Sequence, residues 1–207
     1  MHGSRCAVID FRFGHKPADS ASRKWGGYVA EFKLIEESKS KTCEADADAL
    51  RRNAFAFGPS QKRTFRLEIS KHEHCSSKQL ATVDDFDIYV YSPTMIAAEK
   101  IRAICQQLPG YVLRAHPAPR ARDFYDIHAI VEQEQIRLSE HSELVKAMFE
   151  AKQVPLALVG EIEGARSFHE AAWPIVQQTV SKPLADFDFY FDFVLGIARS
   201  LKSLWNV

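Results

Sequence analysis

The chain has 207 residues and a mass of 23.5 kDa, and its 27 basic and 27 acidic side chains give a formal net charge of zero. Hydrophobic residues make up 46% and charged residues 26% of the sequence, an ordinary globular composition that excludes disorder, a collagen-like repeat or a coiled-coil rod for the whole chain. No apolar run approaches the roughly 18 to 20 residues of a membrane span, and residues 1–6 lack the layout of a secretory signal, so we expect a soluble, cytoplasmic protein.

The first 92 residues are predicted to form a β-rich region. In the first strand, Ile9, Phe11 and Phe13 alternate with Asp10 and Arg12, so the three apolar side chains are expected on one face of the sheet. The strands are expected over residues 5–13, 28–35, 64–70 and 86–91, and a helix over 43–57.

From residue 92 the apolar period changes to that of helices. Ser92 followed by Pro93 predicts an N-cap and a first helical position, and this helix is expected to run to about Gln107. Further helices are predicted over 121–134, 140–151, 155–171 and 187–204, with Pro174 and Pro183 between them. The prediction is therefore an α+β fold with a sheet region over 1–92 and a helical region over 93–207.

Lys100 is the first candidate site residue. On the helix that begins after Ser92, Ile101 and Ile104 are expected to face the core, which would anchor the helix below Lys100. A lysine held in this way is a good phosphate ligand, because its ammonium is a flexible point charge. The alternative is an exposed helix lysine beside Glu99, and spacing alone favours that alternative.

Asp123 and Asp126 open the helix expected over 121–134. They are three residues apart and so share one helix face, with Arg120 and Arg122 beside them in the sequence. Two carboxylates in this position can belong to a site, or they can simply complement the helix dipole in the first turn. The spacing leaves both interpretations open.

Taken in order, these motifs resemble the AbiEii/AbiGii toxin family of nucleotidyltransferase-like proteins. The family's aeK-x-x-A segment corresponds to residues 99–103 (EKIRA), and its RD-x-x-D-h segment to residues 122–127 (RDFYDI). The strand FRLEIS, with Glu68, resembles the family's late sheet strand, where a third carboxylate can lie. The resemblance covers roughly residues 60–135 in sequence and the remainder by architecture.

The resemblance implies a partial nucleotidyltransferase-like mixed sheet followed by a helical bundle. It also implies transfer of a nucleotide from an NTP to an RNA acceptor, such as tRNA, or to a protein acceptor, in a toxin–antitoxin or defence setting with a cognate antitoxin as partner. The implied site residues are Lys100 and Arg122 for the NTP, Lys100, Asp123, Asp126 and Glu68 for catalysis, and Asp10 and Glu68 for Mg²⁺.

The N-terminal part departs from the family pattern. Family members bind the metal through a Gly-Gly or Gly-Ser turn followed by D-x-D on a strand, whereas here Gly3-Ser4 is followed by Asp10 alone and Gly26-Gly27 by Glu31 and Lys33. We expect that this element either lies upstream of Met1 or is degenerate. In the second case the chain would be a non-catalytic module that binds nucleotide or antitoxin.

A different enzyme class is also compatible with the strands. Asp10 together with Glu31 and Lys33 has the D…E-x-K layout of metal-dependent nucleases, in which the acidic pair binds Mg²⁺ and the lysine orients the attacking water. Because Glu31 and Lys33 are two residues apart on a strand, they are expected on the same face. This layout is common on ordinary strands, and the structural interpretation is favoured over the nuclease.

Overall fold

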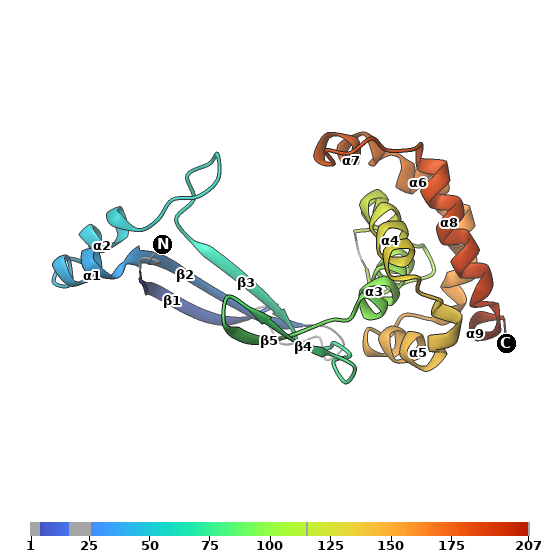
Figure 1. Cartoon of the computed structure of the whole chain (residues 1–207), viewed down its shortest axis with the longest axis horizontal. Helices are drawn as coiled ribbons and strands as arrows, with labels where there is room; N and C mark the ends of the chain where they lie inside the picture. Colours follow the sequence, from blue (N-terminus) through green and yellow to red (C-terminus); the bar gives the residue numbers. More distant parts are fainter. Residues whose placement is uncertain (1–4, 17–25, 115, 207) are drawn as a thin grey trace. The chain divides into compact units, whose positions relative to one another are not determined.

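The computed structural model describes residues 5–16, 26–114 and 116–206, so Gly3-Ser4 lies outside the described residues. Its elements are two small antiparallel sheets and a series of helices, which confirms the predicted α+β class (Figure 1). The chain divides into two compact units, Met1–His72 and Glu73–Val207. These units describe how the chain packs, and the domain boundary predicted at residue 92 stays a prediction. Within the described ranges, no helix is long and apolar enough to cross a membrane.

The first unit is built on a three-stranded antiparallel sheet in the order β1-β2-β3. Two short helices follow the second strand, in place of the single helix predicted over 43–57, and Asp46 caps the second of them through the backbone N–H groups of Asp48 and Ala49. The bounds are β1 Cys6–Lys16, β2 Gly27–Glu36, α1 Glu37–Thr42, α2 Ala47–Asn53 and β3 Phe65–Ser70.

The two faces of this sheet differ in polarity. Arg12, Glu31 and Arg66 lie opposite one another across the three strands and form a charged row. The next row, Phe13, Ala30 and Leu67 in the same strand order, belongs to the other face and is apolar. This alternation is the one expected for half-buried strands.

A β-bulge in β1 overturns one prediction about these faces. Ile9 pairs with Lys33 and Arg12 pairs with Glu31, so the register shifts between them, and Asp10 takes a positive φ of 53°. An inserted residue exchanges the faces of everything before it. The prediction that Ile9 shares a face with Phe13 is therefore wrong, because Ile9 lies on the charged face.

The second unit begins with a β-hairpin, β4 Gln79–Val83 and β5 Phe86–Val90. Asp84 and Asp85 form its two-residue turn, and both have positive φ angles, 49° and 65°. A two-residue turn with positive φ at both positions matches the twist of the two hairpin strands. Aspartate adopts a positive φ more readily than most residues. The strand β4 was not predicted, since the Asp-Asp turn is a weaker marker than Asn-Gly.

Helices make up most of the rest of the second unit, and α4 packs against both α3 and α8 (Figure 1). Ser92 caps α3 by accepting a hydrogen bond from the Met95 N–H at 3.2 Å, which confirms the predicted start. The bounds are α3 Pro93–Cys105, α4 Ala121–Glu134, α5 Ser142–Ala151, α6 Arg166–Glu170, α7 Trp173–Thr179, α8 Phe187–Ser200 and α9 Lys202–Trp205, with 3₁₀ helices η1 Leu138–His141 and η2 Leu156–Ala165.

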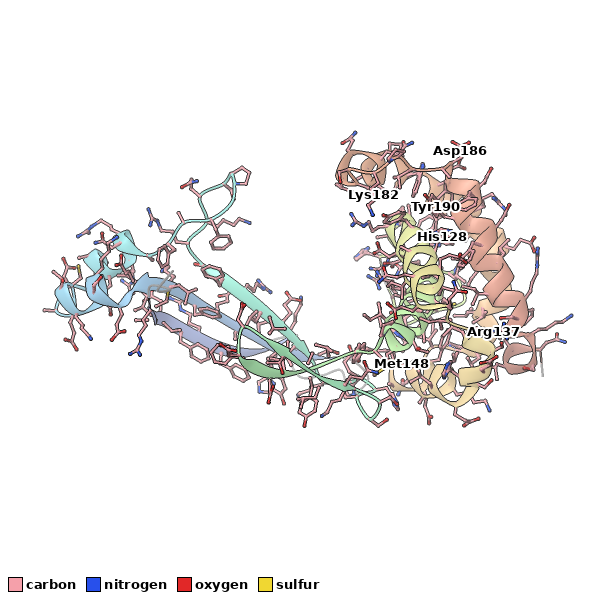
Figure 2. The ribbon with its side chains drawn as sticks, in the orientation of Figure 1. His128, Arg137, Met148, Lys182, Asp186 and Tyr190 are labelled. Carbon is pink, nitrogen blue, oxygen red and sulfur yellow. The ribbon has the colours of Figure 1, made fainter. Side chains whose placement is uncertain are left out.

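Aromatic side chains fill the core of this unit. Phe124 of α4 is fully buried and stacks on Phe191 of α8 with ring centroids 5.1 Å apart. His128, one turn further along α4, meets Tyr190 edge to face (Figure 2). The aromatic run that opens α8 therefore serves mainly the core, although Phe189 is half exposed.

One predicted helix of the second unit differs in the structure, and one helix of this unit was not predicted. The segment predicted as one helix over 155–171 is mostly the 3₁₀ helix η2, followed by the short α6. The helix α7 was not predicted, because a proline such as Pro174 commonly marks a break between helices. Proline is in fact favoured in a first helical turn, where its missing N–H costs nothing, and Pro174 lies in the first turn of α7.

Candidate functional site

Lys100, Asp123 and Asp126 form the centre of the candidate site in the second unit. The ammonium of Lys100 donates hydrogen bonds to Asp123 Oδ1 and to Asp126 Oδ2, both at 2.8 Å. Ile101 and Ile104 are buried beneath the lysine and fix α3 to the core. Because the two aspartates are three residues apart, α4 presents both carboxylates to the same cation.

Two arginines complete this cluster. Arg120 Nε donates to Asp123 Oδ2 at 2.6 Å, and Arg122 Nε donates to Asp126 Oδ1 at 3.4 Å. Three cations therefore surround two carboxylates, which leaves a formal charge of +1. We call Lys100, Arg120, Arg122, Asp123 and Asp126 the charged cluster. Its excess positive charge favours an anionic ligand.

The lysine of the charged cluster is held in its ionised form. Burial opposes ionisation, but the hydrogen bonds and charges of Asp123 and Asp126 outweigh it and raise the pKa of Lys100 above its ordinary value. Its side chain is 18% exposed. An ammonium has three donors, and two are used here, so one remains for a phosphate oxygen.

A buried histidine fixes the start of α4. His169 of α6 is fully buried, and its Nδ1 accepts a hydrogen bond from the backbone N–H of Arg120 at 3.0 Å. The pKa of His169 is lowered to about 4, and burial is the largest cause of this shift. The charge of Asp123 opposes the shift, and the charge of Arg120 adds to it. The ring is therefore neutral at pH 7, with its proton on Nε2, which has no hydrogen-bond partner among the described residues.

An open pocket of about 450 Å³ adjoins the charged cluster, between the start of α4 and α7. Arg122 spans it, because Nη1 of Arg122 donates to Thr179 Oγ1 of α7 at 3.1 Å. Asp123 also lines the pocket. The pocket and the charged cluster are thus continuous.

The first unit holds the other predicted site residues, and there the carboxylates are neutralised. Asp10 pairs with Lys33 at 2.5 Å and with Arg51 at 3.0 Å. The hydrogen bond from Arg51, followed by that from Lys33, lowers the pKa of Asp10 to about 2. Glu68 pairs with Lys16 at 2.7 Å. Both carboxylates are ionised, but each is already paired with cationic side chains.

These residues do not fit a Mg²⁺ site. Asp10 lies in β1 and Glu68 in β3, with β2 between them, so their backbones are roughly 10 Å apart from strand spacing alone. Ligands of one Mg²⁺ must all approach it to about 2 Å. Within the described ranges, no group of three or more His, Cys, Asp or Glu side chains could hold a metal ion.

The nuclease-like trio does come together. Asp10, Glu31 and Lys33 line a small pocket of about 130 Å³ on the charged face of the sheet. However, Lys33 is paired with the Asp10 carboxylate, and Arg66 lies 3.5 Å from Glu31. Each carboxylate thus faces a cation, which is the arrangement of a cross-strand ion-pair network.

The sequence motifs contain Lys100, Asp123 and Asp126, but not the two residues that bind the neighbouring arginines. His169 is 49 residues from Arg120, and Thr179 is 57 residues from Arg122. Neither residue belongs to a local motif. The only sequence indication for the region of Thr179 was Pro174, which marks the first turn of α7.

Comparison with known proteins identifies the family. The family model described as "Nucleotidyl transferase AbiEii toxin, Type IV TA system" matches residues 10–193, which span both units. No curated protein and no solved structure gave a match. The matched range includes the whole charged cluster and confirms the resemblance seen in the motifs around Lys100 and Asp123. The chain belongs to the AbiEii family of nucleotidyl transferase toxins.

Proposed function

We propose that the charged cluster binds the triphosphate of an NTP and that the chain transfers the nucleotidyl group to an RNA acceptor, with tRNA as the first candidate. The observation that supports this most is the charge of the cluster. Lys100 keeps one donor, and the guanidinium groups of Arg120 and Arg122 present planar donors suited to phosphate. Family membership supports the NTP as substrate and an antitoxin as partner.

The proposed reaction can be written from these side chains. An acceptor hydroxyl attacks the α-phosphorus, the new O–P bond forms as the bond to the bridging oxygen breaks, and pyrophosphate leaves. Asp126, which is 25% exposed against 8% for Asp123, takes the hydroxyl proton. Lys100 and Arg122 stabilise the charge of the departing pyrophosphate.

Mg²⁺ enters this proposal only as the counter-ion that accompanies the NTP. No described residue is assigned to it, because Asp10 and Glu68 do not share a site and their carboxylates are paired with Lys33 and Lys16. Since NTP and tRNA are both cytoplasmic, a toxin with this activity would act in the cytoplasm.

Transfer is tested by incubating the full chain and Mg²⁺ with each α-labelled NTP and total tRNA. We expect labelled RNA with the wild type and a loss of at least about 100-fold in Lys100→Gln, the order seen when one charge-stabilising donor is removed. Lys146→Gln is the matched control, since Lys146 is a helix lysine at the surface whose one ion-pair partner among the described residues is Glu143. NTP binding without any labelled acceptor would replace transfer by the non-catalytic alternative.

A further inference from the structure

We propose that the pocket between α4 and α7 binds the nucleoside part of the NTP, with Ile175 as its main apolar contact. We call this pocket the α4–α7 pocket. The inference rests on the proposed function, because it extends the triphosphate site to a second part of the same ligand. The side chains that carry it are Arg120, Arg122, Asp123, Ile175, Val176 and Thr179.

One side of the α4–α7 pocket is charged. Arg120 uses Nε on Asp123, and Arg122 uses Nε on Asp126 and Nη1 on Thr179. Among the described residues, the Nη atoms of Arg120 and Nη2 of Arg122 have no hydrogen-bond partner. Two guanidinium groups with spare donors at the rim are suited to the phosphate end of a nucleotide.

The opposite side is apolar and comes from α7. Ile175 is 64% exposed, although it is a large aliphatic side chain beside a pocket, and the neighbouring Val176 is buried. When an aromatic ring covers exposed aliphatic surface of this kind, the surface is removed from water, and this makes binding more favourable. A base and ribose placed here would cover Ile175 while the phosphates remain at the arginines.

The lining also predicts how selective this contact is. Thr179 is the one uncharged polar side chain among the residues that line the α4–α7 pocket in the described part of the chain. Its Oγ1 already donates to the Val176 carbonyl at 3.0 Å and accepts from Arg122. With no uncommitted amide or hydroxyl to read a base edge, the contact is made to the base face, which all four bases share.

The size of the α4–α7 pocket agrees with this ligand. Its volume of about 450 Å³ lies in the range of roughly 300 to 1,000 Å³ that is typical of small-molecule sites. Phosphate alone would leave most of this space and the exposed face of Ile175 unused.

The test compares ATP with inorganic triphosphate by calorimetry on the full chain. We expect the wild type to bind ATP about tenfold more tightly than triphosphate. Ile175→Ser should weaken ATP about fivefold and leave triphosphate unchanged, because it removes apolar contact only. Val112→Ser is the matched control: Val112 is 87% exposed, follows α3 and does not line the pocket. The four NTPs should bind the wild type within about fivefold of one another.

The outcomes separate this inference from the proposed function. If the wild type binds neither ATP nor triphosphate, the triphosphate site itself is wrong and this inference is overturned with it. If the wild type binds both but Ile175→Ser has the affinities of the wild type, only the nucleoside pocket is wrong. An equal loss of ATP affinity in Val112→Ser would also overturn it.

Discussion

The Nδ1 atom of His169 accepts a hydrogen bond from the backbone N–H of Arg120, and this joins α6 to the N-cap residue of α4. No side chain caps α4 at its start. His169 is therefore the hydrogen-bond acceptor for the backbone N–H of Arg120. It also fixes the position of Arg120, whose side chain binds Asp123. The position of the charged cluster depends on a contact 49 residues away in the sequence.

The first prediction concerns that hydrogen bond. His169→Leu should expose the Arg120 amide to exchange, since a buried donor without a partner costs about 1 to 3 kcal/mol, whereas His169→Asn keeps an acceptor near the position of Nδ1. Amide hydrogen exchange at Arg120, followed by NMR, measures this. Equal protection of the Arg120 amide in the two variants would show that the histidine acts only through packing.

The second prediction is a pH dependence of stability. The pKa of His169 is about 4 in the folded chain against 6.5 ordinarily, so the unfolded state binds more protons between these values. The contribution of the neutral ring is complete above pH 6.5 and is lost as the pH falls toward 4, by up to roughly 3 kcal/mol in the free energy of unfolding.

Urea unfolding at pH 7, 5.5 and 4.5 checks this dependence. The difference between wild type and His169→Asn removes the contribution of the carboxylates, since both chains share them. Asp123 and Arg120 are the charges that act on His169, and both are kept in the variant. A difference that stays constant from pH 7 to 4.5 would mean that His169 is not a buried neutral ring.

The third prediction concerns the stability of the charged cluster. Lys100→Met leaves Asp123, whose side chain is 8% exposed, with Arg120 as its remaining counter-ion. We expect a loss of about 2 kcal/mol in the free energy of unfolding. Lys146→Met removes an exposed pair and should change stability by less than about 0.5 kcal/mol. Similar losses in the two variants would contradict the burial of the Lys100 contacts.

The fourth prediction concerns the bulge in β1. Asp10 has a φ of 53°, a conformation that a residue with a Cβ adopts at a cost of about 1 kcal/mol. Asp10→Gly and Asp10→Ala both remove the carboxylate and differ only in backbone freedom. The glycine variant should be the more stable, as measured by hydrogen exchange of the β1 and β2 amides. A more stable alanine variant would show that the bulge is not maintained in solution.

Local patterns predicted a large part of this structure. The Ser92-Pro93 start of α3 follows from the chemistry of one cap, and Asp123 and Asp126 share a face because of helix period alone. Lys100, Asp123 and Asp126 were candidates on separate grounds, and their hydrogen bonds to one another are a finding of the structure that the motifs did not predict.

The parts that could not be predicted depend on long-range contacts or on a single irregular residue. His169 has no local motif, because its role is to accept a hydrogen bond from a residue 49 positions away. The bulge at Asp10 moves Ile9 to the charged face, and the alternating pattern contains no trace of that shift. The net charge of the charged cluster could not be predicted either, because it depends on which carboxylates and cations pair with one another in the folded chain.

The central claim is that the charged cluster binds triphosphate through its own cations. Calorimetric titration of the full chain with inorganic triphosphate in EDTA tests it most directly, because it needs neither an acceptor nor a metal. We predict binding by the wild type and by Lys146→Gln, an affinity that falls as salt is added, and a loss of at least about tenfold in Lys100→Gln. No binding by the wild type, or equal binding by Lys100→Gln and Lys146→Gln, would contradict the claim.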